Sequence, residues 1–393
     1  MTTSAQPLPA DTVHTVGIAM NGVTGRMGAH QHLESSIVAI REQGGIVLGP
    51  GEVIWPEPVL VGRDAGRLRA LGERFGLSRW TTDLGAALAD PACQIYFDAQ
   101  TTGLRAAGLR AAIDAGKAVY CEKPVTHDLS SAMEVVAQAE RRGVKHGVVQ
   151  DKLFLPGLRK LARLIADGFF GRILSVRGEF GYWVFEGPEP PAQRPSWNYR
   201  REDGGGIVID MFCHWRYLLD NLFGPVQSVF ALEAVHVPER WDEQSHRYTA
   251  TADDAAYAVF ELADGVVAQI NSSWCTRPDR DELFELHVDG TAGSAVAGLR
   301  DCRVQPRGAS PVARWNPDAP NSLALRSAWL NVPDDGVNAG GFKLQWERFL
   351  RHVVADEPFP WGLLEGAKGL QLAELAHQSS VQRRMLEIPA LTT

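Results

Sequence analysis

The sequence is poor in cysteine and contains neither a long basic run nor a long apolar run. Its five cysteines are scattered and form no Cys-x-x-Cys pair, which argues against a disulfide framework or a zinc ribbon and favours a reducing compartment. Acidic residues outnumber basic residues by 47 to 39, which argues against nucleic acid or an anionic membrane as the main partner. No apolar segment reaches the ~18 residues that a membrane-spanning helix needs.

The opening residues also lack a targeting pattern. The stretch MTTSAQPLPADTVHT has no basic patch followed by an apolar core, so we expect no secretory signal and a cytoplasmic protein. We expect residues 1–14 to form a flexible tail. The whole chain of 393 residues is 45% hydrophobic and 22% charged, an ordinary globular composition, and at ~150 residues per domain it predicts two or three domains.

The first half alternates short apolar runs with helical patterns. The expected strands are Val16–Met20, Val59–Gly62, Ile95–Asp98, Ala118–Cys121 and Val144–Val149. The expected helices cover residues 26–42, 65–75, 83–89, 103–115 and 129–142. This alternation predicts an α/β fold with a doubly wound parallel sheet over residues 15–150. The Gly- and Pro-rich stretch from Gly44 to Pro58 interrupts it and predicts an inserted hairpin or flap.

The second half, residues 151–393, favours an α/β domain with a large, open, mostly antiparallel sheet. The expected strands are Ile173–Phe185, Val226–Val235, Ala255–Leu262, Val266–Trp274, Leu283–Asp289 and Ala295–Ala297. Helices are expected at 157–167, 342–355 and 363–384, the last of which could pack back on the first half. Residues 299–340 are rich in Pro and Asn, so we expect an irregular excursion there.

A glycine-rich turn follows the first expected strand and opens the first expected helix. Glycines at 22, 25 and 28 form Gly-x-x-Gly-x-x-Gly, which suits a tight turn, close approach of a pyrophosphate and close helix–strand packing. The alternative is a tight turn without a ligand. His30 and His32 follow in this helix, and we expect them on the cofactor side or at the surface.

The end of the next strand bears on which dinucleotide binds. An acid there would bind the ribose diol of NAD, whereas an arginine would accommodate the 2′-phosphate of NADP. The chain has Gly62-Arg63-Asp64, which leans toward NADP while Asp64 keeps NAD open. We expect the cofactor to contact Gly22, Thr24, Gly25, Arg26, Met27, Gly28, Arg63, Asp64, Thr101, Glu122 and Lys123.

Two further motifs carry candidate catalytic groups. Glu122-Lys123-Pro124 follows a parallel strand at its carboxyl end, where doubly wound folds bind ligands, and a lysine beside a nicotinamide would have a lowered pKa. Alternatively, Lys123 is an ordinary surface lysine. Asp210 and His214 lie four residues apart on one face of an apolar helix that follows Gly204-Gly205-Gly206. They could be a catalytic pair or a satisfied core pair; without a third ligand motif we expect no metal.

Aromatic and polar residues near the second motif are candidates for substrate binding. Aromatic faces pack on sugar C–H surfaces, and polar tips bind hydroxyls. We expect the substrate to contact Lys123, Lys152, Trp183, Trp197, Tyr199, Asp210 and His214. The alternative for the aromatic residues is a core cluster.

Together these motifs resemble the Gfo/Idh/MocA family, which contains glucose-fructose oxidoreductase, inositol 2-dehydrogenase and many sugar dehydrogenases. The resemblance covers roughly residues 15–385 and includes Gly168-x-x-Gly171 and Gly290–Ser294. It implies an N-terminal Rossmann domain and a C-terminal sheet through which members associate, here as a homodimer or homotetramer. The Gly-x-x-Gly-x-x-Gly spacing and the Gly44–Pro58 stretch depart from the family pattern.

The resemblance implies NAD(P)-dependent oxidation, or the reverse reduction, of a secondary alcohol on a small polyhydroxylated substrate such as a sugar, cyclitol or glycoside. We expect His214 to take the hydroxyl proton, Asp210 to orient its imidazole, and Lys123 to stabilise charge on the reacting oxygen. Two alternatives stay open. One is an NAD-dependent glycosidase or lyase that oxidises its substrate transiently, and the other is a non-catalytic sugar or dinucleotide sensor.

Overall fold

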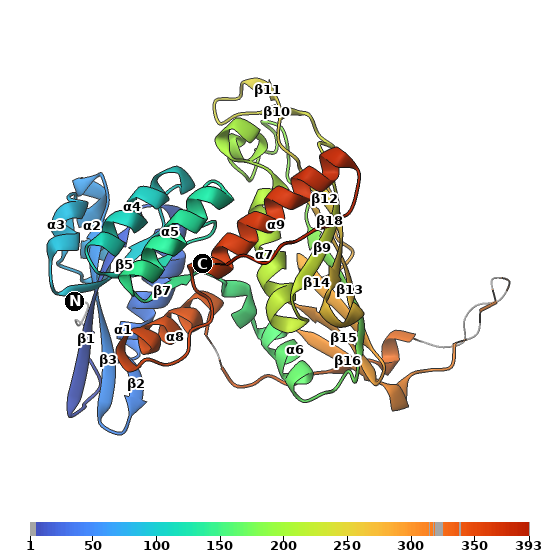
Figure 1. Cartoon of the computed structure of the whole chain (residues 1–393), viewed down its shortest axis with the longest axis horizontal. Helices are drawn as coiled ribbons and strands as arrows, with labels where there is room; N and C mark the ends of the chain where they lie inside the picture. The colour runs from blue at the N-terminus through green and yellow to red at the C-terminus, as the bar shows by residue number, and fades with distance from the viewer. Residues whose placement is uncertain (1–4, 314, 317, 319–324, 338, 393) are drawn as a thin grey trace. The chain divides into compact units, whose positions relative to one another are not determined.

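The computed structural model describes residues 5–313, 315–316, 318, 325–337 and 339–392. Its contacts divide the chain into two compact units (Figure 1). The first unit comprises Met1–Phe154, Asn338–Lys368 and Leu391–Thr393, and the second comprises Leu155–Val337 and Gly369–Ala390. Within the described residues, no helix combines the length and the apolar character needed to cross a bilayer.

The first unit is built on a seven-stranded sheet in the order β2-β3-β1-β5-β6-β7, with β4 paired to β3. All pairs in it are parallel except β2 with β3. Its strands are β1 (Thr12–Asn21), β2 (Ile46–Gly49), β3 (Glu52–Val61), β4 (Trp80–Thr81), β5 (Cys93–Asp98), β6 (Ala118–Cys121) and β7 (His146–Val148). Its helices are η1 (Met27–Val38), α1 (Ala39–Glu42), α2 (Ala65–Phe75), α3 (Leu84–Ala89), α4 (Thr102–Asp114), α5 (Leu129–Arg142), η2 (Asp151–Phe154) and α8 (Gly341–Ala355). The predicted doubly wound α/β fold is confirmed.

The Gly44–Pro58 stretch forms the predicted hairpin, but it is not a separate flap. β2 and β3 pair in antiparallel fashion, and β3 then continues through Pro56 and Pro58 as a strand paired with β1 along its whole length. The strand expected at Val59–Gly62 therefore begins at Glu52. Most of the first expected helix is wound as a π-helix, η1, with α1 as its last turn.

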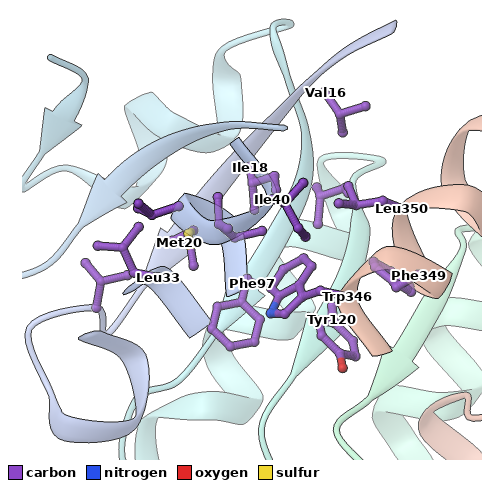
Figure 2. Close-up of a cluster of buried hydrophobic side chains, with 14 of the residues drawn as sticks. Val16, Ile18, Met20, Leu33, Ile40, Phe97, Tyr120, Trp346, Phe349 and Leu350 are labelled. Atoms are coloured by element: carbon purple, nitrogen blue, oxygen red, sulfur yellow. The ribbon is translucent and has the colours of Figure 1, made fainter. Parts of the chain in front are cut away.

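A late segment of the chain completes the hydrophobic core of the first unit. Trp346, Phe349 and Leu350 of α8 are fully buried in one cluster with residues of β1, η1, α1, β5 and β6. Figure 2 shows the indole of Trp346 lying between Phe97 and Tyr120. The last expected helix, residues 363–384, also contributes here: its first residues, Leu363–Lys368, belong to the first unit, and the N–H of Leu363 donates to Nδ1 of His146 at 3.1 Å.

The second unit contains a nine-stranded sheet in the order β17-β16-β15-β14-β8-β13-β12-β9-β18, antiparallel except for β8 with β13. Its strands are β8 (Ile173–Gly181), β9 (Val226–Ala234), β12 (Ala255–Leu262), β13 (Val267–Ser273), β14 (Phe284–Gly290), β15 (Gly293–Gly298), β16 (Cys302–Pro306), β17 (Leu330–Asn331) and β18 (Leu386–Glu387). Helix α6 (Pro156–Ala166) packs on β15 and β16, and α7 (Ile207–Leu222) packs on β9, β12 and β13 (Figure 1). The predicted large, mostly antiparallel sheet is confirmed.

Several short elements were missed or placed differently from the sequence. β16 and β17 lie within residues 299–340, which we expected to be irregular; the rest of that stretch includes residues outside the described ones. A small hairpin of β10 (Glu239–Trp241) and β11 (Arg247–Thr249) was not expected. Helix α9 (Leu363–Gln382) matches the last expected helix, and the division into units falls within it.

Candidate active site

The glycine turn of the first unit can hold only glycine at two of its positions. Gly22 has φ +83°, and a Cβ on it would lie 2.6 Å from the carbonyl carbon of Ala99. A Cβ on Gly28 would lie 2.5 Å from the carbonyl oxygen of Gly22. Gly25 closes the turn by donating its N–H to that same oxygen at 3.1 Å. The three glycines therefore bring β1, the start of η1 and the β5–α4 loop into close contact.

Helix capping divides the helices of this unit into two groups. Asp64, Asp83 and Asp128 cap α2, α3 and α5, each accepting an N–H bond from the first turn of its helix. In contrast, η1 after Arg26, α4 after Thr101 and α8 after Gly340 have no side-chain cap and no acid in the first turn. The first N–H groups of a helix need acceptors. Of these three helices, η1 follows the glycine turn and the loop before α4 contacts it, so these two helix starts suit the phosphates of a dinucleotide.

Arg63 and Asp64, in the turn after β3, differ in their contacts. Arg63 is exposed. The carboxylate of Asp64 is occupied locally, because Oδ1 accepts from the N–H of Arg67 at 3.0 Å as the cap of α2. Thr24 lies close by, with its methyl carbon 3.7 Å from where a Cβ on Gly62 would be.

Glu122 anchors the backbone of Lys123. One oxygen of its buried carboxylate lies 2.8 Å from Nε2 of His32, and the other accepts the N–H of Lys123 at 3.0 Å. Nδ1 of His32 accepts from the indole N–H of Trp346 at 3.0 Å. Burial acts to raise the pKa of Glu122, but the His32 hydrogen bond and the charges of Lys123 and Arg105 outweigh it and lower that pKa to about 2. Glu122 is thus ionised at neutral pH.

A second buried network holds the same turn from the side of β5. Arg105 of α4 donates to Asp98 at the end of β5, to the carbonyl of Gln100 and to the carbonyl of Pro124. Tyr96 donates to the other Asp98 oxygen at 2.6 Å. Asp98 and Arg105 are both almost fully buried, so the ion pair is shielded from water. The loop that carries Lys123 is therefore fixed at both of its flanks.

In the second unit, the start of α7 depends on Gly206 and Asp253. Gly206 has φ +125°, and a Cβ on it would lie 2.5 Å from Oδ1 of Asp253. The other Asp253 oxygen accepts the N–H of Val208 at 2.8 Å and so caps the helix. Burial and the charge of Glu233 raise the pKa of Asp253 to about 6, against the opposing effect of the Val208 bond.

Helix α7 presents the candidate catalytic pair of this unit. His214 is 4% exposed, and its Nδ1 lies 2.8 Å from the hydroxyl of Tyr217. Asp210 is partly exposed, and Oδ2 accepts from Nη2 of Arg194 at 2.6 Å. Within the described residues, no group of three or more His, Cys, Asp and Glu side chains is arranged to hold a metal ion.

The other predicted substrate contacts fall into different environments. Lys152 lies in η2 of the first unit, 3.7 Å from Oδ1 of Asp151. In the second unit Trp183 is half-buried under Arg277, and Trp197 is 49% exposed. Tyr199 is 1% exposed and packs against Arg240 and Trp274. Tyr199 is therefore a core residue in this structure. Its contact with the substrate stays a prediction.

Sequence reasoning missed four buried polar groups that hold these motifs in place: His32, Arg105, Arg194 and Asp253. We expected His32 at the surface or beside the cofactor, and it is fully buried. Asp253 and Asp254 directly precede the apolar run Ala255–Phe260, which was a visible signal for buried acids. Arg105 and Arg194 offer no such signal, because each reaches its partner through the fold.

Comparison with known proteins identifies the relatives of the chain. The family model "Oxidoreductase family, NAD-binding Rossmann fold" matches residues 17–150, and "GFO/IDH/MocA C-terminal domain" matches residues 158–296. D-xylose dehydrogenase of Paenarthrobacter nicotinovorans is 54% identical over 96% of this chain and 98% of its own length. The chain belongs to the Gfo/Idh/MocA family. It is therefore an NAD(P)-dependent oxidoreductase, as the motifs indicated.

More distant relatives of this Gfo/Idh/MocA oxidoreductase extend the comparison. D-apiose dehydrogenase of Paraburkholderia graminis is 28% identical over 84% of this chain and 82% of its own length. A solved levoglucosan dehydrogenase, in complex with NADH and levoglucosan, has the same fold with a TM-score of 0.77. That match covers 96% of this chain and 100% of the solved one, at 19% identity.

The glycine turn fits a dinucleotide on structural grounds. The turn excludes side chains at Gly22 and Gly28, and the uncapped starts of η1 and α4 offer N–H groups near it. Thr24, Gly25, Arg26 and Met27 would hold the pyrophosphate, with Thr101 at the start of α4. When bound, the cofactor supplies the hydride acceptor of the reaction.

Proposed function

We propose that this oxidoreductase is a sugar dehydrogenase that oxidises a CH–OH group of D-xylose or a closely similar neutral sugar. The observation that carries the proposal is the 54% identity to a D-xylose dehydrogenase over nearly the full length of both chains. Support also comes from the retention of Lys123, Asp210 and His214 together, because a sensor would not need this set. The first unit would bind the cofactor and the second the sugar.

In the proposed mechanism, the residues of this chain handle the proton and the charge on oxygen. His214 takes the proton of the reacting hydroxyl while the C–H bond gives up its hydride and a carbonyl forms. Lys123 donates a hydrogen bond to that oxygen and stabilises its developing negative charge. Asp210, which accepts from Arg194, keeps negative charge near the imidazole as it becomes positive. Lys152, Trp183 and Trp197 orient the sugar.

We also propose a preference for NADP over NAD. Arg63 is exposed and can reach a 2′-phosphate, whereas Asp64 is engaged as the cap of α2 and is less suited to a ribose diol. Glycine at position 62 places no carboxylate at the strand end. The bound NADH of the levoglucosan dehydrogenase structure belongs to a relative of low identity, so it does not decide this preference.

Assembly and location form the remaining part of the proposal. We propose that the exposed face of the nine-stranded sheet joins copies of the chain into a homodimer or homotetramer. Apolar side chains on its strands support this: Leu174, Tyr257 and Val267 are 38–45% exposed. The scattered free cysteines support a cytoplasmic location.

The test is absorbance at 340 nm with D-xylose, other pentoses and hexoses, using NAD and NADP in turn. The proposal predicts one reduced cofactor per sugar oxidised, with the highest kcat/KM on D-xylose. A product formed without net absorbance change would identify a glycosidase or lyase with transient oxidation. Binding without turnover would identify a sensor. Thermal shifts with each ligand separate failure to bind from failure to react.

A further inference from the structure

A cavity of about 280 Å³ lies in the second unit, between the loop of residues 187–196 and the hairpin of β10 and β11. Its lining includes Arg194, Ser196, Trp241, Asp242 and Glu243. The volume is near the lower end for small-molecule sites and suits a ligand of one ring. None of the residues named above for cofactor or sugar binding lines it.

The walls of the cavity are tied together by hydrogen bonds. The carboxylate of Glu243 accepts both the N–H and the hydroxyl of Ser196, at 2.8 and 2.9 Å. Trp241 donates its backbone N–H to the carbonyl of Glu186 at 3.0 Å. Loop and hairpin are thus joined at two points, and the cavity is formed without a ligand.

The lining chemistry matches a neutral sugar ring. Trp241 offers an aromatic surface for C–H groups, and the carboxylates of Asp242 and Glu243 accept hydroxyl protons. The backbone N–H of His246 lowers the pKa of the Asp242 carboxyl, and the backbone N–H of Ser196 lowers that of Glu243. Both carboxyls are therefore ionised at neutral pH and repel an anionic ligand. Each carboxylate oxygen can accept a further hydrogen bond, so a neutral hydroxyl suits this lining.

Two buried polar atoms, one on a lining residue and one on the chain neighbour of a lining residue, have no hydrogen-bond partner among the described residues. They are the donor Nε of Arg194, which lines the cavity, and the acceptor Oε2 of Glu186, whose neighbour Gly187 lines it. Buried polar atoms are nearly always satisfied, so the unpaired donor of the lining residue Arg194 indicates a polar ligand or water.

Arg194 connects the cavity to the candidate catalytic helix. Its Nη2 bonds Asp210, its Nη1 lies 3.3 Å from the hydroxyl of Tyr182, and its guanidinium stacks on Trp274 at 4.1 Å. We propose that the cavity is a second carbohydrate subsite, which takes a neutral sugar ring linked to the ring that is oxidised. The inference rests on the proposed function, since it makes oligosaccharides substrates of the same site.

The test compares D-xylose with β-1,4-xylobiose in three proteins: wild type, Trp241→Ala and Trp315→Ala. Trp315 is 93% exposed and does not line the cavity, so it is the matched control. We expect wild type to oxidise xylobiose with a kcat/KM at least equal to that for D-xylose. Trp241→Ala should lower the ratio of the two kcat/KM values at least tenfold, and Trp315→Ala should leave it unchanged.

A second variant tests the cavity independently, in case Trp241→Ala misfolds. Ala192→Trp fills the cavity from the loop side and should lower the same ratio as Trp241→Ala does. The inference is overturned if wild type oxidises D-xylose but not xylobiose, or if both variants leave the ratio unchanged. Absence of D-xylose oxidation in wild type would instead refute the proposed function, so the two failures are distinct.

Discussion

Nε2 of His32 lies 2.8 Å from Oε1 of Glu122, and both side chains are buried. Because the other ring nitrogen of His32 accepts from Trp346, the imidazole carries its proton on Nε2 and donates it to the carboxylate. The second oxygen of Glu122 holds the N–H of Lys123. A candidate catalytic lysine is thus positioned through its backbone by a residue of η1 and a residue of α8.

This contact predicts a loss of stability in acid. The folded-state pKa of Glu122, about 2, lies below its ordinary 4.5, so ionised Glu122 stabilises the fold fully above pH 4.5. The stabilisation is lost as the pH falls from 4.5 to 2, by on the order of 3 kcal/mol. Glu122→Gln removes it at every pH. Denaturant unfolding should show that the difference in unfolding free energy between wild type and Glu122→Gln shrinks as the pH falls from 7 to 3.

The control for that experiment is Glu134→Gln, because Glu134 forms an exposed ion pair with Arg110. Its unfolding free energy should stay within ~1 kcal/mol of wild type throughout. Parallel pH curves for wild type and Glu122→Gln would contradict the role given to the His32–Glu122 contact.

The contribution of Asp253 to stability should change with pH in the opposite direction to that of Glu122. Its folded-state pKa, about 6, lies above the ordinary 3.8, so its ionisation disfavours the folded state as the pH rises from 3.8 to 6. Asp253→Asn keeps an oxygen for the N–H of Val208 and lacks this charge, so it should match or exceed wild-type stability at pH 7. Asp253→Ala lacks both the charge and the cap, so it should be less stable than Asp253→Asn by ~1 kcal/mol or more.

Thermal melts at pH 5 and pH 7 distinguish these outcomes. If Asp253→Asn lost as much stability at pH 7 as Asp253→Ala, the charge of Asp253 would be stabilising, contrary to this account.

The proposed cofactor preference depends on Arg63. Arg63→Ala removes the only contact that we assign to a 2′-phosphate, so kcat/KM for NADP should fall about tenfold or more while that for NAD changes less than threefold. Arg300→Ala, in the second unit and exposed, is the matched control and should alter neither value. An equal fall for both cofactors would place Arg63 outside 2′-phosphate recognition.

Periodic apolar runs made much of the fold predictable, but the prolines of β3 concealed the first half of that strand. Pro56 and Pro58 argue against a central strand because proline donates no ladder hydrogen bond. Among the described strands, β2 and β4 pair only with the two ends of β3, so the prolines occupy a part with a strand on one side only. That arrangement depends on the partners of β3, which its own sequence does not reveal.

The site was predictable only where a motif is local. Lys123, Asp210 and His214 stand in short motifs that can be found without a structure. In contrast, Trp346 reaches His32 across 314 positions, and Arg194 reaches Asp210 from a loop with no regular pattern. Such contacts arise from tertiary packing, so single-sequence reasoning found the candidate chemistry but not the groups that position it.

The most direct test of the central claim is kcat for Lys123→Met with D-xylose, measured beside reduced-cofactor binding by fluorescence. If Lys123 stabilises charge on the reacting oxygen, kcat should fall by ~10²-fold or more while cofactor binding persists. Near-normal turnover in Lys123→Met would contradict the account.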